Sequence, residues 1–269
     1  MNLPTVETLQ LREDGFVLHV TLNRPESRNA MSLQMTQELR AVFTAIHDSD
    51  SIRAVVLRGA GGHFCAGGDI KDMAGARMRA MESSNDEAYA ELNRAFGHMI
   101  TQVDHAPQVV IAVLEGAVMG GGFGLACVSD VAIARQDAKF ALPETGLGIL
   151  PAQIAPFVVQ RVGFTQARRL ALLGSRFDGA EAARIGIAHH VVADSAELDA
   201  VLAATLDQVK KCAPEANRAT KALLHRVGHE PLEALLDDAA RQFARAVAGA
   251  EGAEGTLAFV QKRPAKWAE

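Results

Sequence analysis

The sequence is poor in aromatic residues and cysteine. Only 5% of its 269 residues are aromatic, with one Trp and one Tyr, which argues against a platform for stacking nucleic-acid bases. A formal net charge of −5 also argues against a general nucleic-acid binder, because such proteins usually carry a basic surplus. Cys65, Cys127 and Cys212 are far apart and form no CxxC pair. We therefore expect neither a disulfide framework nor a metal site.

Long apolar runs are also missing. In the apolar centre, residues 117–129 are free of charge, but glycines interrupt this stretch and it is too short to cross a bilayer. The first 14 residues contain no basic segment followed by an apolar run, so no secretory signal is expected. With 49% hydrophobic and 22% charged residues, the composition is typical of a globular protein. We expect a cytoplasmic protein that has no membrane or nucleic-acid partner.

The first part of the chain predicts alternating strands and helices. Apolar patterns predict strands at 16–22, 54–57, 109–114, 131–134 and 139–142, and helices at 32–49 and 120–129. Two of these strands run into glycine turns, one ending at Gly67-Gly68 and the other at Gly120-Gly121-Gly122. This weak internal repeat suggests stacked strand–turn–helix units in one core.

The pattern changes twice further along the chain. Residues 75–95 are polar and show little periodicity, which predicts a mobile loop that enters a helix at about 89–103. From residue 194 onward the pattern is helical, with one apolar stripe over 198–209, another over 232–247 and a last short helix near 254–260. We therefore expect an α/β core over residues 1–195 and a helical region over residues 196–269.

The glycine turns allow two interpretations. Neither fits a dinucleotide fingerprint, because Phe64 and Leu125 stand where the third glycine is required. A glycine turn that enters a helix leaves backbone N–H groups free and lets a substrate oxygen approach without a Cβ in the way. Two such turns would form an oxyanion hole. In the alternative interpretation, the glycines only allow close packing of a helix on a sheet.

Four motifs carry a resemblance to a known family. They are, in chain order, Asn23-Arg24-Pro25 with Asn29-Ala30-Met31, then Phe64 to Lys71, then Glu115 to Gly122, and finally Phe140 to Glu144 with Gly148. These resemble the CoA-binding segment, the two oxyanion loops and the catalytic-glutamate segment of the crotonase (enoyl-CoA hydratase/isomerase) superfamily. The resemblance covers nearly the whole chain. It implies an α/β fold of the ClpP/crotonase type, a spiral of ββα turns followed by a helical C-terminal trimerisation region.

The resemblance also implies a substrate and a site. The substrate would be an acyl-CoA thioester, so coenzyme A would be part of the substrate and no separate cofactor is expected. Gly68 and Gly121 would donate their N–H groups to the thioester oxygen, and Glu144 would be catalytic. Asp69 would fix its loop. The residues implied in CoA or substrate binding are Arg24, Arg28, Ala30, Ala66, Gly67, Asp69, Ile70, Lys71, Pro143, Phe259 and Lys262.

The same resemblance predicts an assembly. Members of the superfamily commonly form homotrimers or dimers of trimers, so we expect one of these states. Lys262 resembles the C-terminal position that reaches CoA from the neighbouring subunit. The segment from Met73 to Glu87 would form one wall of the acyl pocket.

One departure from the family pattern limits the reaction. Ordinary enoyl-CoA hydratases of the family have two glutamates, of which the second matches Glu144 and the first falls at Gly124. A single carboxylate suits an isomerase that moves one proton, and it also suits a hydratase in which Glu144 alone activates water. A non-catalytic CoA-thioester binder is the third alternative.

A second local resemblance favours hydration. Residues 148–159 and Arg176 to Gly179 resemble bacterial glutaconyl-CoA hydratases of leucine and acyclic-terpene catabolism, which also have glycine at the first glutamate position. Within that group the chain is closer to isohexenylglutaconyl-CoA hydratase than to 3-methylglutaconyl-CoA hydratase. The expected reaction is hydration of the C2=C3 bond of a β-branched 2-enoyl-CoA that carries a distal carboxylate.

Overall fold

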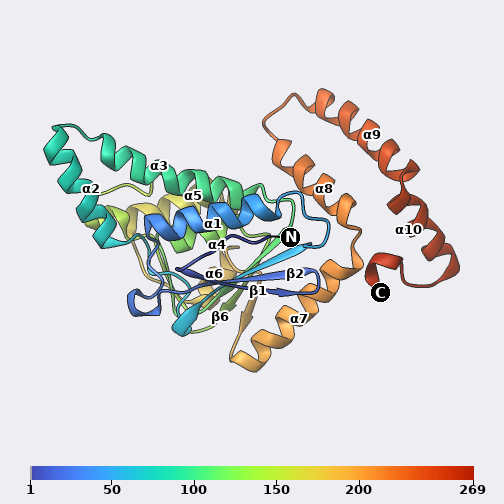
Figure 1. The fold of residues 1–269 in the computed structure, drawn as a ribbon, viewed down its shortest axis with the longest axis horizontal. Helices are drawn as coiled ribbons and strands as arrows, with labels where there is room; N and C mark the ends of the chain where they lie inside the picture. The colour runs from blue at the N-terminus through green and yellow to red at the C-terminus, as the bar shows by residue number, and fades with distance from the viewer. Residues whose placement is uncertain (1) are drawn as a thin grey trace.

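A six-stranded sheet forms the centre of the molecule (Figure 1). The computed structural model describes residues 2–269. The strands lie in the order β1 (Leu9–Asp14), β2 (Val17–Leu22), β3 (Ala54–Gly59), β4 (Val109–Leu114), β6 (Val131–Arg135) and β8 (His190–Val192). β1 and β2 pair antiparallel, and every other neighbouring pair is parallel. The helices are α1 (Leu33–Ile46), α2 (Ile70–Ser83), α3 (Glu87–Asp104), α4 (Gly121–Val128), α5 (Ala155–Leu173), α6 (Gly179–Arg184), α7 (Ser195–Lys211), α8 (Pro214–Arg226), α9 (Leu232–Ala248) and α10 (Ala250–Gln261).

The apolar strands are buried on both faces, as parallel strands covered by helices require. In β3, Val55 and Leu57 face the larger core, to which α1, α3 and α4 contribute. Ala54 and Val56, the alternate residues, face a second core on the opposite side of the sheet. The predicted strands over 54–57 and 109–114 are confirmed, because an uninterrupted apolar run is the pattern of a strand with no exposed face.

A second layer of short strands links successive turns of the fold. β5 (Ala117–Met119) pairs in parallel with β7 (Lys139–Ala141), and Cys65 forms an isolated bridge to Val118. Each of the strands β3, β4 and β6 is thus followed by a short second-layer segment and then by a helix. This arrangement confirms the spiral of ββα turns. It also brings together the loops that follow the strands at one edge of the sheet.

The segment before α3 differs from its prediction. Residues 70–83 form α2, so the expectation of a loop across this region was wrong, and its mobility stays a prediction. Asp69 caps the helix, accepting a hydrogen bond of 2.7 Å from the backbone N–H of Lys71. Only the small side chains Ala76 and Ala80 are buried, where they meet Ala88 at the start of α3. A helix held by alanines has too weak an apolar stripe for its periodicity to be detected.

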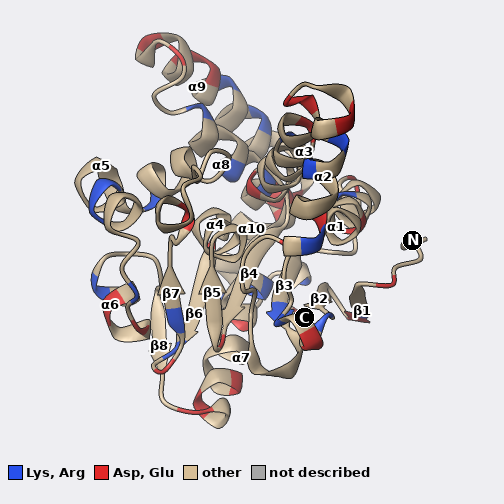
Figure 2. Cartoon of the chain, turned by 90° about the vertical axis from the view of Figure 1, so that its left-hand side faces the viewer, with Lys and Arg blue, Asp and Glu red and all other residues tan. Residues whose placement is uncertain are grey.

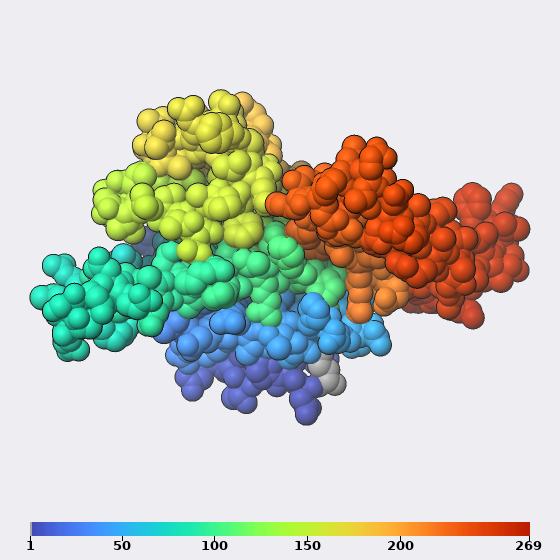
Figure 3. Space-filling model, turned by 90° about the horizontal axis from the view of Figure 1, so that it is seen from above, coloured from blue at the N-terminus to red at the C-terminus, as the bar shows by residue number. Residues whose placement is uncertain are grey.

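The two apolar stripes of the C-terminal region differ in burial. Leu198 and Val209 of α7 are buried against the second face of the sheet. The large side chains of the stripe on α9 are exposed, apart from Leu235. α9 and α10 extend away from the body at the end opposite α2 (Figures 1 and 3). The division at residue 195 stays a prediction, since α7 packs with the core. Among residues 2–269, no helix combines the length and apolarity needed to cross a membrane.

Candidate active site

Backbone hydrogen bonds join the first glycine loop, Phe64 to Lys71, to the second, Glu115 to Gly122. The N–H of Cys65 donates to the carbonyl of Ala117 over 2.9 Å, and the N–H of Met119 donates to the carbonyl of Cys65 over 2.9 Å. A Cβ on Gly122 would lie 2.6 Å from Cβ of Cys65, so only glycine allows this contact. Burial raises the pKa of the Cys65 thiol to about 11, which leaves it a neutral packing group.

The predicted CoA-binding segment is attached to the same loop. The N–H of Ala66 donates to the carbonyl of Arg28 over 3.0 Å, and the N–H of Met31 donates to the carbonyl of Gly67 over 2.7 Å. The N–H of Asp69 returns a bond of 3.1 Å to the carbonyl of Met31. The N–H of Gly68, between these bonds, is left without a partner among residues 2–269.

Gly121 supplies the second free donor. It is the first residue of α4, where a helix leaves its N–H groups unsatisfied, and it donates to no acceptor within the described chain. α4 carries no charged residue, so the positive end of its dipole is not offset from within the helix (Figure 2). Two free N–H groups on adjoining loops are the elements of an oxyanion hole.

Both loops meet the predicted catalytic glutamate at Gly120. Gly120 has a φ of 50°, and a Cβ built there would lie 2.9 Å from Oε1 of Glu144 and 3.4 Å from Cα of Gly67. The absence of a side chain therefore lets the carboxylate and the first loop approach each other. The structure brings Gly67, Gly120 and Glu144 together, although they are up to 77 positions apart.

Glu144 is held at this place by its own short helix. It is the first residue of the 3₁₀ helix Glu144–Leu147, directly after Pro143, and its carbonyl accepts a hydrogen bond of 3.0 Å from the N–H of Ile149. Its Oε2 atom is buried without a hydrogen-bond partner among the described residues. Burial raises the pKa of Glu144 above its ordinary value, although a backbone hydrogen bond opposes the shift. A half-buried carboxylate that has an unpartnered oxygen and a raised pKa is suited to accept a proton.

The position of the missing glutamate is closed by apolar groups. Gly124 is buried, and a Cβ there would clash with Cγ2 of Ile154 and lie 2.9 Å from Cδ1 of Ile100. The ring of Phe96 covers Gly121, with Cε2 3.0 Å from a Cβ built there. The sequence analysis missed Phe96, Ile100 and Ile154 as site residues. The spacing of Phe96 and Ile100, four residues apart in an expected helix, was the available signal.

The predicted CoA contacts divide into two groups. Arg24 forms an ion pair of 2.6 Å with Asp69 and donates to the carbonyl of Ala30 over 2.7 Å, so it braces the loop. Burial favours a higher pKa for Asp69, but hydrogen bonds from Arg24 and the backbone hold it below its usual value. Arg28, Ile70 and Lys71 are exposed beside this loop. Their contacts with CoA stay predictions.

Two residues predicted to contact CoA lie away from the glycine loops and Glu144 of the same chain. Phe259 and Lys262 are exposed at the end of α10. α10 lies at the opposite end of the molecule from α2 (Figures 1 and 3). A contribution of Lys262 to a neighbouring subunit therefore stays a prediction.

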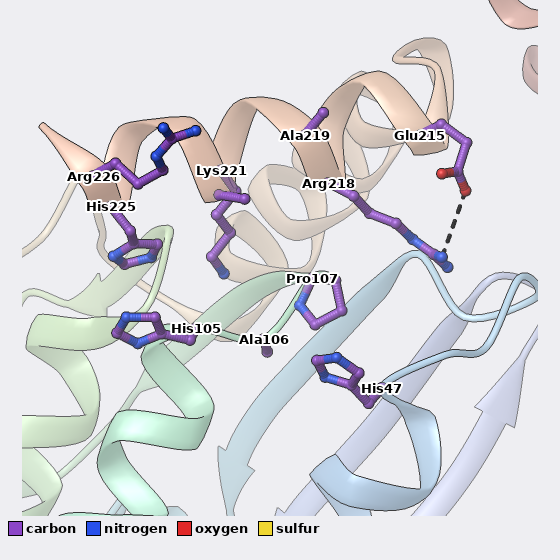
Figure 4. Close-up of a pocket in the computed structure, with 11 residues that line it drawn as sticks. His47, His105, Ala106, Pro107, Glu215, Arg218, Ala219, Lys221, His225 and Arg226 are labelled. Atoms are coloured by element: carbon purple, nitrogen blue, oxygen red, sulfur yellow. Dashed lines mark ion pairs between the residues drawn. The ribbon is translucent and has the colours of Figure 1, made fainter. Parts of the chain in front are cut away.

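A cavity of about 560 Å³ lies between α8 and the segment after α3 (Figure 4). Asp104, His105 and His225 gather beside it, with ligand atoms within 4.8 Å of one another. The two imidazole rings are stacked 4.3 Å apart and only 17° from parallel. Their in-plane lone pairs therefore cannot converge on one ion, and this cluster does not form a metal site as it stands.

The comparison with protein families decides the identity. The model of the enoyl-CoA hydratase/isomerase family matches residues 12–269. The chain belongs to the enoyl-CoA hydratase/isomerase family. This confirms the superfamily and the fold class expected from the motifs. The family acts on acyl-CoA thioesters, and the chain is an enzyme of the hydro-lyase type.

Relatives of this family are similar over almost the whole chain. The solved structure of AtuE from Pseudomonas aeruginosa is 64% identical, covers 98% of this chain and 100% of its own, and superposes with a TM-score of 0.95. An enoyl-CoA hydratase/isomerase from Marinobacter aquaeolei is 61% identical over 97% of this chain and 99% of its own, with a TM-score of 0.93. The probable enoyl-CoA hydratase echA8 of Mycobacterium tuberculosis is 33% identical over 96% of this chain and 97% of its own.

Proposed function

We propose that this enzyme hydrates the C2=C3 bond of a β-branched 2-enoyl-CoA with a distal carboxylate, of the isohexenylglutaconyl-CoA or 3-methylglutaconyl-CoA type. The observation that carries this proposal is the half-buried carboxylate of Glu144, which lies at Gly120 beside two glycine loops with free N–H donors and whose Oε2 atom is buried without a partner among residues 2–269. The resemblance of residues 148–159 to glutaconyl-CoA hydratases supports the choice of substrate.

In the proposed reaction the thioester oxygen accepts hydrogen bonds from the N–H groups of Gly68 and Gly121. These bonds stabilise the negative charge that develops when the oxygen of water attacks C3 and the C2=C3 electron pair shifts towards the thioester. Glu144 takes a proton from the attacking water. The enolate then regains its thioester double bond while C2 takes that proton from Glu144, so one water is added and the carboxylate is regenerated.

The apolar closure at Gly124 supports a branched substrate. In a two-glutamate hydratase a second carboxylate would project from this position, but here Ile100 and Ile154 occupy the space. An alkyl substituent on C3 is compatible with these side chains, whereas a polar group facing them would lose its hydration. Glu144 then performs both proton transfers, and the branch on C3 rests against Ile100 and Ile154.

The proposal also covers the cofactor, the oligomeric state and the location of the enzyme. Coenzyme A enters as part of the substrate, and the chemistry above requires no separate cofactor. The exposed apolar stripe on α9 supports a homotrimer or a dimer of trimers. We also propose a cytoplasmic location, where acyl-CoA thioesters are available.

A panel of thioesters tests the reaction. Purified enzyme is mixed with 3-methylglutaconyl-CoA, isohexenylglutaconyl-CoA and crotonyl-CoA, and the absorbance of the conjugated thioester is followed together with product mass. Loss of absorbance with a mass gain of one water on a branched, carboxylated substrate is the expected result. A change of absorbance without a change of mass would instead identify an isomerase. No reaction with any thioester, despite binding, would identify a CoA-thioester binder and overturn the proposal.

A further inference from the structure

An exposed arginine on α3 contacts the residue that precedes Ile154, at the apolar end of the site. Nη1 of Arg94 donates to Oε1 of Gln153 over 3.1 Å, and Nε2 of Gln153 donates to Oδ1 of Asn93 over 3.0 Å. The amide of Gln153 is thereby oriented with its oxygen towards the guanidinium. This small network links α3 to the segment that precedes α5.

The position of this network follows from its neighbours. Gln153 directly precedes Ile154, which closes Gly124, and Arg94 lies one to two turns before Ile100, which closes it from α3. Between them, Phe96 covers the oxyanion glycine Gly121. The network therefore adjoins the apolar wall on which the proposed C3 branch would rest.

Gly97 makes room for the network. A Cβ on this buried glycine would lie 2.5 Å from Nη1 of Arg94 and would clash with Oε1 of Gln153. The guanidinium and the amide therefore lie across the helix backbone, close to α3, because residue 97 has no side chain. An alanine there would force both groups outward.

The charge of Arg94 is not neutralised within the chain. No carboxylate of residues 2–269 forms an ion pair with it, and it donates instead to the neutral amide of Gln153. Arg24, on the CoA side of the site, is by contrast paired with Asp69 at 2.6 Å. A guanidinium has five N–H donors in a planar fork that matches a carboxylate, so most donors of Arg94 remain available for an anion.

We propose that Arg94, positioned by Gln153 and Asn93, binds the distal carboxylate of the substrate. This inference rests on the proposed function, because it assigns the carboxylate of that substrate class to a named residue. The carboxylate is attached close to C3 through the branch, so its receptor must adjoin the apolar wall at Ile100 and Ile154. Arg94 satisfies this requirement and carries the required charge.

Binding of two saturated thioesters tests the assignment independently of turnover. 3-Methylglutaryl-CoA and isovaleryl-CoA have the same branch and differ only in the carboxylate, and their dissociation constants are measured by calorimetry. We expect wild-type enzyme to prefer the carboxylated thioester, and R94Q to lose about 10- to 100-fold in affinity for it, the range for a hydrogen bond to a charged group. Affinity for isovaleryl-CoA should stay within about threefold in the same variant, since a rim charge away from a contact contributes little.

Three further variants sharpen the test. R94K should retain part of the preference, because it keeps the charge but loses the planar fork. G97A should reduce the preference with the arginine intact, because its methyl group displaces the guanidinium. R40Q removes an exposed arginine of α1 and should change neither affinity. An unchanged preference in R94Q, or an equal loss for both thioesters, would overturn the inference. Failure of the proposed function would be seen separately, as absence of hydration in the thioester panel.

Discussion

Glu144 combines two properties that a single proton carrier needs. Its Oε1 lies near the backbone of Gly120, and its Oε2 is buried without a partner among residues 2–269. We expect Glu144→Gln to keep the shape of the site but to lower turnover about 10²- to 10⁴-fold, the usual cost of losing a general acid/base. Acyl-CoA binding should change little, because Gly68 and Gly121 are untouched. Stopped-flow turnover and calorimetry on the best panel substrate measure the two effects.

The matched control for this prediction is Glu91→Gln, which alters an exposed glutamate on α3. Turnover of the control should equal that of wild type. If Glu144→Gln keeps activity within about threefold of wild type, well short of the expected loss, the proton carrier is another group.

The raised pKa of Glu144 predicts a pH dependence. The base must be deprotonated, so kcat/KM should rise with pH along an acid limb whose midpoint lies above 4.5, the ordinary value for Glu144. The contribution of Glu144 to folding stability changes with pH in the opposite direction. Because the folded pKa is raised, Glu144 favours the folded state below the unfolded pKa, and this contribution is lost as pH rises through the folded pKa. As pH rises from the unfolded to the folded pKa of Glu144, the free energy of unfolding should therefore fall less for Glu144→Gln than for wild type, as measured by denaturant unfolding. Identical pH profiles would contradict the assigned cause, which is burial.

Some site residues could be predicted from the sequence and others could not. The glycines at 68 and 121 and the glutamate at 144 lie in contiguous motifs, and the geometry at Gly120 brings these motifs together. Ile154 and Arg94 act through contacts between elements that are distant in sequence. No local pattern indicates which side chain will pack against a buried glycine. These residues could therefore be identified only from the folded structure.

At the scale of elements, α2 is the weakly anchored helix beside the site. It buries only Ala76 and Ala80, while Ile70 and Met81 are more than two-thirds exposed. Few buried apolar contacts give a low free energy of local opening. We expect amides of residues 70–83 to exchange hydrogen faster than those of residues 97–103, which are the buried half of α3, and acyl-CoA to slow the exchange in α2. Hydrogen-exchange mass spectrometry measures both segments in one experiment.

The α2 prediction retains the earlier expectation that this segment forms one wall of the acyl pocket. Equal exchange in residues 70–83 with and without acyl-CoA would remove that role. The C-terminal half of α3 serves as the internal reference for slow exchange, since Met99 and Val103 are fully buried.

The elements themselves differ in how well the sequence reveals them. β3 and β4 are uninterrupted apolar runs, and α1 buries Met35, Leu39 and Phe43 at helical spacing, so all three were predictable. β1 has a largely polar sequence, LQLRED, and exists because β2 pairs with it along one edge. α2 lacks large apolar residues on its buried face. Where tertiary contacts rather than local pattern decide the structure, the prediction fails.

At the scale of the whole molecule, the α9 stripe is apolar surface that a single chain leaves uncovered. Leu232, Leu236, Phe243 and Val247 are each more than half exposed. We expect Phe243→Asp to shift the protein from trimers or hexamers towards monomers, because a charge in an apolar interface must be desolvated. Light scattering at micromolar concentration measures the mass of each species.

Ala234→Asp is the matched control for assembly. This residue is exposed on the opposite side of α9, so the added charge should leave the assembly intact. A stable wild-type monomer at micromolar concentration, or equal dissociation by both variants, would contradict the proposed interface.

The closed position at Gly124 has a stereochemical consequence. Ile100 and Ile154 offer no proton carrier there, so under the proposed hydration both new bonds form on the face of the planar enoyl group that meets Glu144. Addition of water is therefore syn, and the product has one configuration at C3. In deuterium oxide a single one of the two C2 hydrogens should carry the label, and proton NMR of the product would distinguish this from a scrambled methylene.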